Sequence, residues 1–305
     1  YVRSSPVIAD GVVYFGSNDG YLYAIDENDG SLIWSFPLGW GGGVTTVAVA
    51  DGVVYTGSMI MDSAGGPYGT KFYALDAKDG SVKWTYPLHN WGGGSVPVVV
   101  NDVVYIGDYF TGLYAIHTGD GSLKWEVPGR ISDESNYGAT VFNQIVYYNS
   151  PWGVRAVNIV DGSELWNQPA GAGTGLMTYS NGVLYGDLNG KGIVALDAFD
   201  LSIKWASPEG NSNSMYNYII APSVAVEDSS IYFIGQDLNI YCLNANDGSR
   251  KWVYSTGSVI PWNFWYYAAS PSLSNGMVYA PGILTNKLYA ITAQSGTLVW
   301  SYELG

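Results

Sequence analysis

Seven tryptophans recur along the chain, each at the end of the same short phrase: Trp34, Trp84, Trp125, Trp166, Trp205, Trp252 and Trp300. In the first copy the phrase runs from Ala24 and Asp26 through Asp29-Gly30 to Trp34. Successive tryptophans are 50, 41, 41, 39, 47 and 48 residues apart. A period near forty residues with strand-like content is typical of one propeller blade per repeat. The sequence therefore predicts an all-β fold, a seven-bladed β-propeller with four antiparallel strands per blade.

The first repeat shows how one blade is encoded. Its four strands are expected at residues 6–9, 12–17, 21–25 and 31–36, separated by turns that contain Asp-Gly or Asn-Asp-Gly. Such turns between β-branched and aromatic runs are strong hairpin signals. Because no single repeat can bury both of its faces, we expect one domain over residues 1–305. The expected blades are at about 1–39, 40–89, 90–129, 130–170, 171–209, 210–257 and 258–305.

The composition argues against several classes of binding partner. The formal net charge is −14, which disfavours nucleic acid because phosphate binding needs a basic field. An anionic membrane surface is disfavoured for the same reason. The sequence contains no apolar run long enough to cross a bilayer. Cys242 is the single cysteine, so an internal disulfide is impossible. We expect a monomer.

Two positions of the repeat indicate how the blades would pack. A small residue recurs before the third turn at Ala24, Ala74, Ala115, Ala156, Ala195 and Ala290, with Cys242 in the sixth copy. The Asp-Gly turn recurs in five copies and degrades to Asp200-Leu201 and Ser295-Gly296 in the others. We expect the tryptophan to fill the space between blades, with its indole N–H near a backbone carbonyl.

The phrase Ala-x-Asp-x-x-Asp-Gly-x-x-x-Trp resembles the repeat of the pyrroloquinoline-quinone (PQQ) propeller family, and the resemblance covers essentially the whole chain. That family contains quinoprotein dehydrogenases. It also contains non-catalytic propellers, among them a bacterial outer-membrane assembly lipoprotein and luminal stress-sensor domains. The resemblance, together with the low lysine content, implies an extracytoplasmic location: periplasmic, secreted or cell-surface.

Strand order predicts two unlike rims. The turn rim carries the short turns between strands one and two and between strands three and four, and it holds most of the acidic residues. Calcium binding by turns such as residues 26–30 is one interpretation, and aspartates that cap their own turns are the other. The loop rim carries the turns between strands two and three and the links between blades, where almost all length variation occurs. Variable loops on a rigid scaffold commonly build binding sites.

The loop rim therefore holds the candidate ligand-binding residues, which are aromatic or among the few cations and histidines: Arg3, Trp40, His89, Trp91, Arg130, Tyr137, Trp152, Trp262, Trp265 and Tyr266. Clustered aromatic side chains in loops suit a protein hot spot, a glycan or a small planar ligand. In the alternative, Trp262, Phe264 and Trp265 fold inward and plug the central funnel. The second histidine, His117, belongs to a turn and is expected at the surface.

Two functions remain open. We expect a non-catalytic propeller that binds a ligand or protein, or serves as a scaffold, through the loop rim and funnel, with no catalytic residue, no metal and no cofactor. The alternative that the resemblance implies is a PQQ- and calcium-dependent alcohol or sugar dehydrogenase. Such enzymes often cover the quinone with a vicinal cysteine pair, which a single cysteine excludes. The loop-rim carboxylates match no family motif: Asp62, Asp108, Asp133, Glu134 and Asp187.

Overall fold

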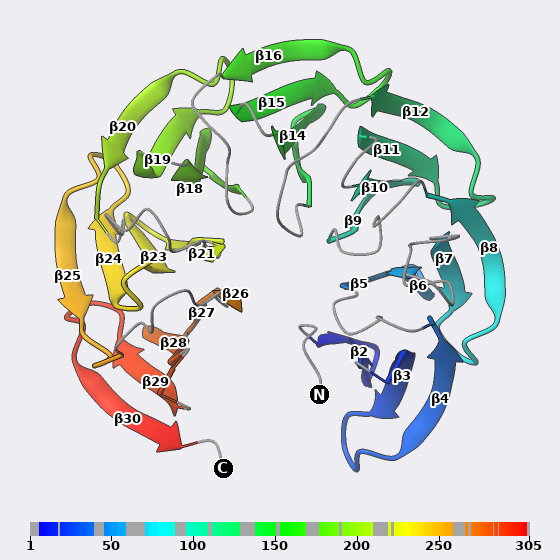
Figure 1. Ribbon diagram of the computed structural model, residues 1–305, viewed down its shortest axis with the longest axis horizontal. Coiled ribbons are helices and arrows are strands. Elements are labelled where there is room, and N and C mark those ends of the chain that lie inside the picture. The colour runs from blue at the N-terminus through cyan, green and yellow to red at the C-terminus, as the bar shows by residue number, and fades with distance from the viewer. Residues whose placement is uncertain are drawn as a thin grey trace, which may run out of the picture. The chain divides into compact units, whose positions relative to one another are not determined.

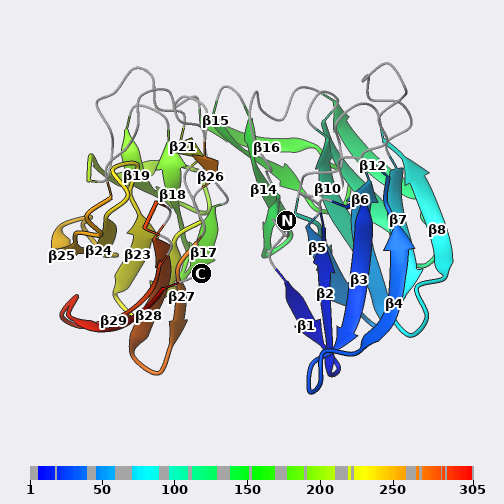
Figure 2. The same cartoon turned by 60° about the horizontal axis from the view of Figure 1, so that its bottom comes forward.

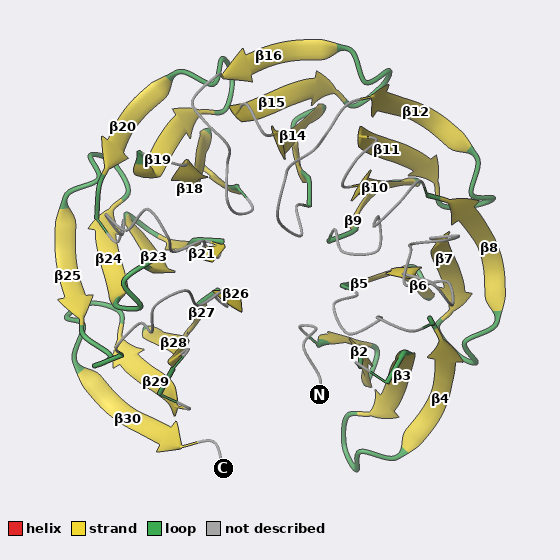
Figure 3. Ribbon diagram, in the orientation of Figure 1, coloured by secondary structure: helices red, strands yellow, loops and turns green. Residues whose placement is uncertain are grey.

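The structure is a computed structural model of residues 1–305. It describes residues 6–17, 19–39, 46–58, 71–88, 96–108, 112–128, 138–150, 153–168, 177–188, 191–209, 219–220, 223–258, 266–267, 270–282, 284–285 and 287–303. For residues 219–220 and 266–267 it describes the backbone. No helix occurs among the described residues, which form strands joined by turns and loops (Figure 3).

Seven four-stranded antiparallel sheets follow one another along the chain, and these sheets are the blades of a seven-bladed β-propeller. Each sheet takes its strands in sequence order. Blades 1 to 4 contain β1 (Val7–Ala9), β2 (Val12–Gly16), β3 (Tyr21–Asp26), β4 (Leu32–Pro37); β5 (Val47–Ala50), β6 (Val53–Ser58), β7 (Lys71–Asp76), β8 (Val82–Pro87); β9 (Val98–Val100), β10 (Val103–Asp108), β11 (Gly112–His117), β12 (Leu123–Pro128); and β13 (Thr140–Phe142), β14 (Ile145–Ser150), β15 (Gly153–Asn158), β16 (Glu164–Gln168). Blades 5 to 7 contain β17 (Thr178–Ser180), β18 (Val183–Leu188), β19 (Gly192–Asp197), β20 (Ile203–Ser207); β22 (Ala225–Glu227), β23 (Ser230–Ile234), β24 (Ile240–Asn244), β25 (Arg250–Tyr254); and β27 (Ser272–Ser274), β28 (Met277–Gly282), β29 (Lys287–Thr292), β30 (Leu298–Glu303).

The chain divides into two compact units. Unit 1 is Tyr1–Pro151 with Ala156–Leu165, and unit 2 is Trp152–Arg155 with Trp166–Gly305. Within unit 1 the fourth strands β4, β8 and β12 lie on the outer side of their blades, and β20, β25 and β30 do so within unit 2 (Figure 1). A single domain over residues 1–305 stays a prediction. No helix in the described part of the chain is long and apolar enough to cross a membrane.

The turns of the turn rim form as their residue types dictate. Asp10-Gly11 and Asp51-Gly52 join the first two strands of their blades with positive φ at both residues, as a two-residue hairpin turn requires. Within blade 1, the β1–β2 turn and the β3–β4 turn lie at the same end (Figure 2).

The turn-rim aspartates bind their own backbone. Asp247 Oδ1 accepts hydrogen bonds from the Ser249 N–H at 2.9 Å and the Ser249 hydroxyl at 2.6 Å, and these bonds hold the pKa of Asp247 below its usual value. The same aspartate–serine bond recurs in five other blades at Asp29, Asp79, Asp120, Asp161 and Asp200. Within the described ranges no group of three or more His, Cys, Asp or Glu side chains could hold a metal ion. These hydrogen bonds are the capping of their own turns that the second interpretation of these aspartates predicts.

A β-bulge sets the position of six of the seven tryptophans. Ala24 lies opposite Trp34 in the β3–β4 pair, whereas the next residue, Ile25, lies opposite Leu32, so Ile33 is the extra residue of the bulge. The same shift follows Ala74, Ala115, Ala195, Cys242 and Ala290. All seven residues of the small slot, Ala156 included, are fully buried, which confirms that this slot serves close packing.

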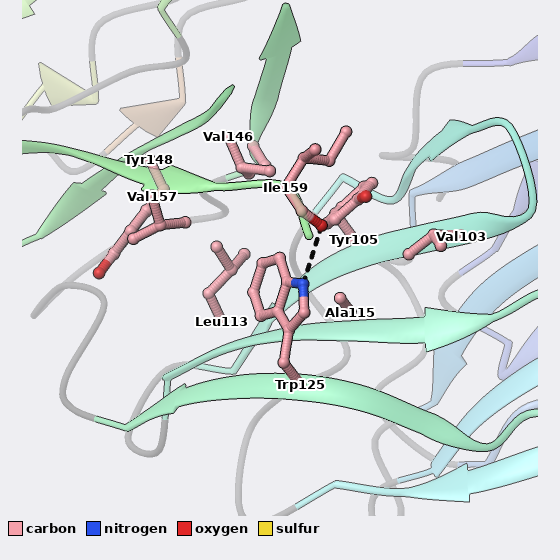
Figure 4. Packing of buried hydrophobic residues seen from close by; sticks show 10 residues of the cluster. Val103, Tyr105, Leu113, Ala115, Trp125, Val146, Tyr148, Val157 and Ile159 are labelled. Carbon is pink, nitrogen blue, oxygen red and sulfur yellow. Dashed lines mark hydrogen bonds between the residues drawn. The ribbon is translucent and has the colours of Figure 1, made fainter. Parts of the chain in front are cut away.

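The tryptophans fasten each blade to the turn of the next. Trp125 Nε1 donates to the carbonyl of Ile159 at 3.0 Å, and its indole packs in a buried cluster with Tyr105 and Leu113 from its own blade and Val146 and Val157 from blade 4 (Figure 4). The indoles of Trp34, Trp84, Trp205 and Trp252 bind the equivalent carbonyls at 2.7–3.0 Å. The expected indole–carbonyl bond is thus confirmed at five blades.

Two tryptophans differ from this pattern. Trp300 is 43 % exposed, and its packing between blades stays a prediction. Trp166 is half-buried, and within the described part of the chain its indole N–H has no hydrogen bond. Gln168, two residues later, binds the turn of blade 5 at a different carbonyl, since its Nε2 donates to the Leu201 carbonyl at 2.8 Å.

Candidate functional site: the loop rim

Most candidate residues of the loop rim lie outside the described residues: Arg3, Trp40, His89, Trp91, Arg130, Tyr137, Trp152, Trp262 and Trp265. Asp62, Asp133, Glu134 and Phe264 do so as well. Tyr266 is the exception, because its backbone belongs to a described strand. The geometry of the loop rim is therefore built from the described residues at the bases of these loops.

An extra sheet joins two inter-blade links of unit 2. The strand β21 (Ile219–Ile220) lies in the link between blades 5 and 6, and β26 (Tyr266–Tyr267) lies in the link between blades 6 and 7. They pair in parallel, with Ile219 opposite Tyr266 (Figure 1). The aromatic segment that ends at Tyr266-Tyr267 is thus tied to a second link by backbone hydrogen bonds. Sequence reasoning did not predict this pair, although both segments are rich in β-branched and aromatic residues.

A polar network fixes the start of the link between blades 6 and 7. Asp237 accepts hydrogen bonds from the Tyr241 hydroxyl at 2.6 Å and from the Asn239 side-chain amide at 2.8 Å. Asn239 Oδ1 in turn accepts from the Thr256 N–H at 3.3 Å, and the Thr256 hydroxyl donates to the Leu238 carbonyl at 2.9 Å. Burial, reinforced by the bond to Asp237, raises the pKa of Tyr241 far above its usual value, so the phenol stays protonated.

Blade 7 holds the same link from the other side. The Tyr289 hydroxyl lies 3.3 Å from the Thr256 carbonyl and 3.0 Å from Thr285 Oγ1. Its ring packs against Tyr254 of blade 6 with centroids 5.5 Å apart. Thr256 is therefore hydrogen-bonded to both blades. The link that carries Trp262 and Trp265 thus starts from a residue that is held in a fixed position.

Sequence reasoning missed Asp237 and Thr256, but a signal for Asp237 was present. Asp237 precedes the strand-three tyrosine Tyr241 by four residues, and Asp19 precedes Tyr23 by the same spacing in blade 1. The structure shows the same bond in both, since the Tyr23 hydroxyl donates to Asp19 Oδ2 at 2.7 Å. The spacing thus marks a loop-rim turn closed by a tyrosine–carboxylate bond.

Two loop-rim carboxylates proved to be strand residues. Asp187, placed on the loop rim from the sequence, lies inside β18 opposite Ile193 and is 4 % exposed. Asp108 is the last residue of β10, opposite Gly112. The β18 hairpin extends one residue beyond Asp187, to the Leu188–Gly192 pair, and this extension removes Asp187 from the loop.

Cys242 has a structural position. It stands in the small slot of blade 6 opposite Trp252 and is fully buried in the cluster shared by blades 6 and 7. Burial raises the pKa of its thiol, which keeps the group in the unreactive thiol form. A buried thiol at this strand position cannot cover a ligand at the loop rim.

The geometry of the described residues provides fixed attachment points for the links of the loop rim. The described bases of the loops are rigid strand ends, a short parallel sheet and a closed hydrogen-bond network, and together they hold variable aromatic links on one rim. Such a platform presents large side chains at low entropic cost, which is the requirement for recognition of a partner surface.

Comparison with protein families identifies the repeat. The family model described as outer membrane protein assembly factor BamB matches residues 18–175 and residues 136–259. The two matches together span residues 18–259, more than half of the 305 residues. A search of curated proteins found no match.

Solved structures share the fold at low sequence identity. BamB from Moraxella catarrhalis superimposes with a TM-score of 0.71 at 13 % identity, over 98 % of this chain and 84 % of that one. The quinohemoprotein alcohol dehydrogenase from Comamonas testosteroni gives a TM-score of 0.76 at 15 % identity, over 100 % of this chain and 67 % of the enzyme. A computationally designed protein, Ika8, gives 0.72 at 14 % identity, over 100 % and 87 %. These likenesses concern the fold, whereas the family match covers most of the sequence: the chain belongs to the PQQ-repeat propeller family described as outer membrane protein assembly factor BamB.

Proposed function

We propose that this chain is a non-catalytic, protein-binding propeller that uses the loop rim as its recognition surface. The observation that carries the proposal is the family match over residues 18–259, because the family's description is that of a protein assembly factor. The fixed bases of the aromatic links support a binding role. The partner we propose is a protein of the cell envelope, and the location extracytoplasmic, with the propeller acting as a monomer.

The second candidate function is a PQQ- and calcium-dependent dehydrogenase, favoured by the superposition on the Comamonas testosteroni enzyme. The described side chains that could bind a quinone or calcium do not support this second function. The one cysteine is buried in a blade seam, and the turn-rim aspartates are bound to their own turns. Any residues that held a quinone and calcium would have to come from the loops outside the described ranges.

A site-specific cross-linking experiment tests the proposal. Benzoylphenylalanine is placed at Trp91 and, separately, at Trp265, and the variants are irradiated in cells of the source organism. The matched controls carry the probe at Val253 and at Leu298, which are exposed on the outer strands β25 and β30. We expect a discrete protein adduct from the two loop-rim positions, identifiable by mass spectrometry, and none from the controls.

The companion variants Trp91→Ala and Trp265→Ala should lose affinity for the cross-linked partner while their melting temperatures stay unchanged. Adducts that form only from Val253 or Leu298 would place the recognition surface on the outer strands instead. Normal binding by both alanine variants would equally contradict the assignment to the loop rim.

A further inference from the structure

The β19–β20 turn of blade 5 differs from the equivalent turn of five other blades. At those five, a turn glycine lies so close to the indole of the preceding blade that a Cβ would sit 2.5–2.8 Å from it: Gly80 on Trp34, Gly121 on Trp84, Gly162 on Trp125, Gly248 on Trp205 and Gly296 on Trp252. Blade 5 has Leu201 at this position, with φ +58° and a buried side chain. Its Cβ occupies the space that the indole face takes elsewhere, so Trp166 cannot make the same stack.

Trp166 packs on an exposed phenylalanine instead. Its ring lies 5.3 Å from that of Phe199, at an interplanar angle of 47°. Phe199 is 73 % exposed, in the middle of the β19–β20 turn. The equivalent turn residue is polar or glycine in five blades, at Asn28, Lys78, Gly119, Asn246 and Gln294, and it is Val160 in blade 4. Unit 2 therefore presents an aromatic pair at a place where the repeat normally presents a polar group.

Two carboxylates flank the pair, and one of them is ion-paired. Asp197 and Asp200 flank Phe199 in the turn, and Asp197 Oδ2 is paired with Lys204 Nζ at 2.8 Å. Asp200 is exposed, and its Oδ1 accepts the Ser202 N–H at 2.8 Å. The whole chain carries a net charge of −14, which repels a second copy and attracts a basic partner.

We propose that Trp166 and Phe199, flanked by Asp197 and Asp200, form a second docking site for a basic amphipathic segment of a partner protein. Lysine or arginine side chains of the segment lie against the faces of the two rings, where the ring quadrupole attracts a cation. Its apolar side chains cover Phe199, and the exposed carboxylate of Asp200 complements its charge. This site is on the turn rim and is independent of the loop-rim surface.

The side chain of Phe199 can be replaced without disturbing the hydrogen bonds of the turn. The Phe199 N–H, not its side chain, makes the local bond, to Asp197 Oδ1 at 2.8 Å. The Asn246 N–H makes the same bond to Asn244 Oδ1 at 3.0 Å in blade 6. Phe199→Asn therefore installs a residue that the repeat already accepts, and it leaves the net charge unchanged. The matched control is Val160→Asn, at the same turn position of blade 4, where Val160 is 62 % exposed.

Binding is measured by fluorescence anisotropy with a labelled six-residue peptide of alternating lysine and leucine. We expect Phe199→Asn to weaken binding by about tenfold, as for loss of an aromatic hot spot. Val160→Asn should change it by less than about twofold, the usual effect of a position outside a hot spot. A serine–leucine peptide should bind more weakly than the lysine–leucine peptide. Leu201→Gly should also weaken binding, because it reopens the space in which Trp166 can stack on the turn.

Equal affinity of the parent chain and Phe199→Asn would overturn the proposal, since the remaining attraction would then be unspecific charge. Equal binding of the lysine and serine peptides would also overturn it. Circular dichroism and thermal melting check the fold of each variant. Phe199→Lys, the residue type of blade 2 at this slot, is a second variant and should weaken binding further through its charge.

Discussion

Trp125→Ala is expected to lower the free energy of unfolding by about 3–5 kcal/mol, the range for removing a buried large aromatic side chain. Trp125 is 7 % exposed, packs against Tyr105 with centroids 5.7 Å apart and donates to the Ile159 carbonyl at 3.0 Å. The substitution leaves a cavity between blades 3 and 4 and a buried carbonyl without that donor. Urea denaturation followed by tryptophan fluorescence, with circular dichroism as a second probe, measures the loss.

Trp166→Ala is the matched comparison. Trp166 ends the same phrase, yet it is half-buried and makes no hydrogen bond through its indole within the described part of the chain. Removing it should cost about 1–2 kcal/mol, mostly from the apolar area that it still buries. Equal losses of unfolding free energy for the two variants would contradict this prediction, because burial and the indole hydrogen bond would then make no difference to what a tryptophan contributes.

Gly162→Ala is expected to cost about 2–4 kcal/mol, because it combines a left-handed backbone with an overpacked contact. Gly162 has φ +72°, and a Cβ there would lie 2.8 Å from Cε3 and 2.9 Å from Cδ2 of Trp125. The indole is held by its neighbours and by the bond to Ile159, so it cannot move away without losing that bond.

Gly52→Ala separates the two causes. Gly52 has φ +70° in a two-residue turn of the same unit, and a Cβ there meets nothing within 4 Å. Gly52→Ala should therefore lower the free energy of unfolding only through its left-handed backbone, by about 1–2 kcal/mol. The difference between the two variants is the contribution of the tryptophan contact. If both cost the same, the glycine of the repeat serves the turn alone.

The period of the tryptophans was sufficient to predict the blades, because each repeat encodes the same hairpins. The four expected strands of blade 1 differ from β1–β4 by one residue at five of their eight ends, such as 6–9 for Val7–Ala9. The difference in the β19–β20 turn of blade 5 was not predicted. The degraded turn Asp200-Leu201 was visible in the sequence, but its consequence needed the geometry: a Cβ placed where an indole packs elsewhere.

The candidate site was less predictable from the sequence. Variable links indicate which rim is specialised, yet they do not show which links pair with each other. The parallel pairing of Ile219 with Tyr266 joins segments 47 residues apart, and neither segment has a hairpin signal. Asp187 was misplaced because the sequence does not show that β18 runs on to Leu188, and the strand position of Asp187 makes its carboxylate buried.

Titration of the purified protein with PQQ and calcium tests most directly whether the propeller only binds or also catalyses. The quinone absorbance retained after gel filtration gives the stoichiometry, and dye-linked oxidation of short-chain alcohols gives the activity. A protein-binding propeller retains no stoichiometric quinone and reduces no dye above the rate without protein. Uptake of one quinone per chain with calcium-dependent, alcohol-dependent dye reduction would contradict the account and make this chain a quinoprotein dehydrogenase.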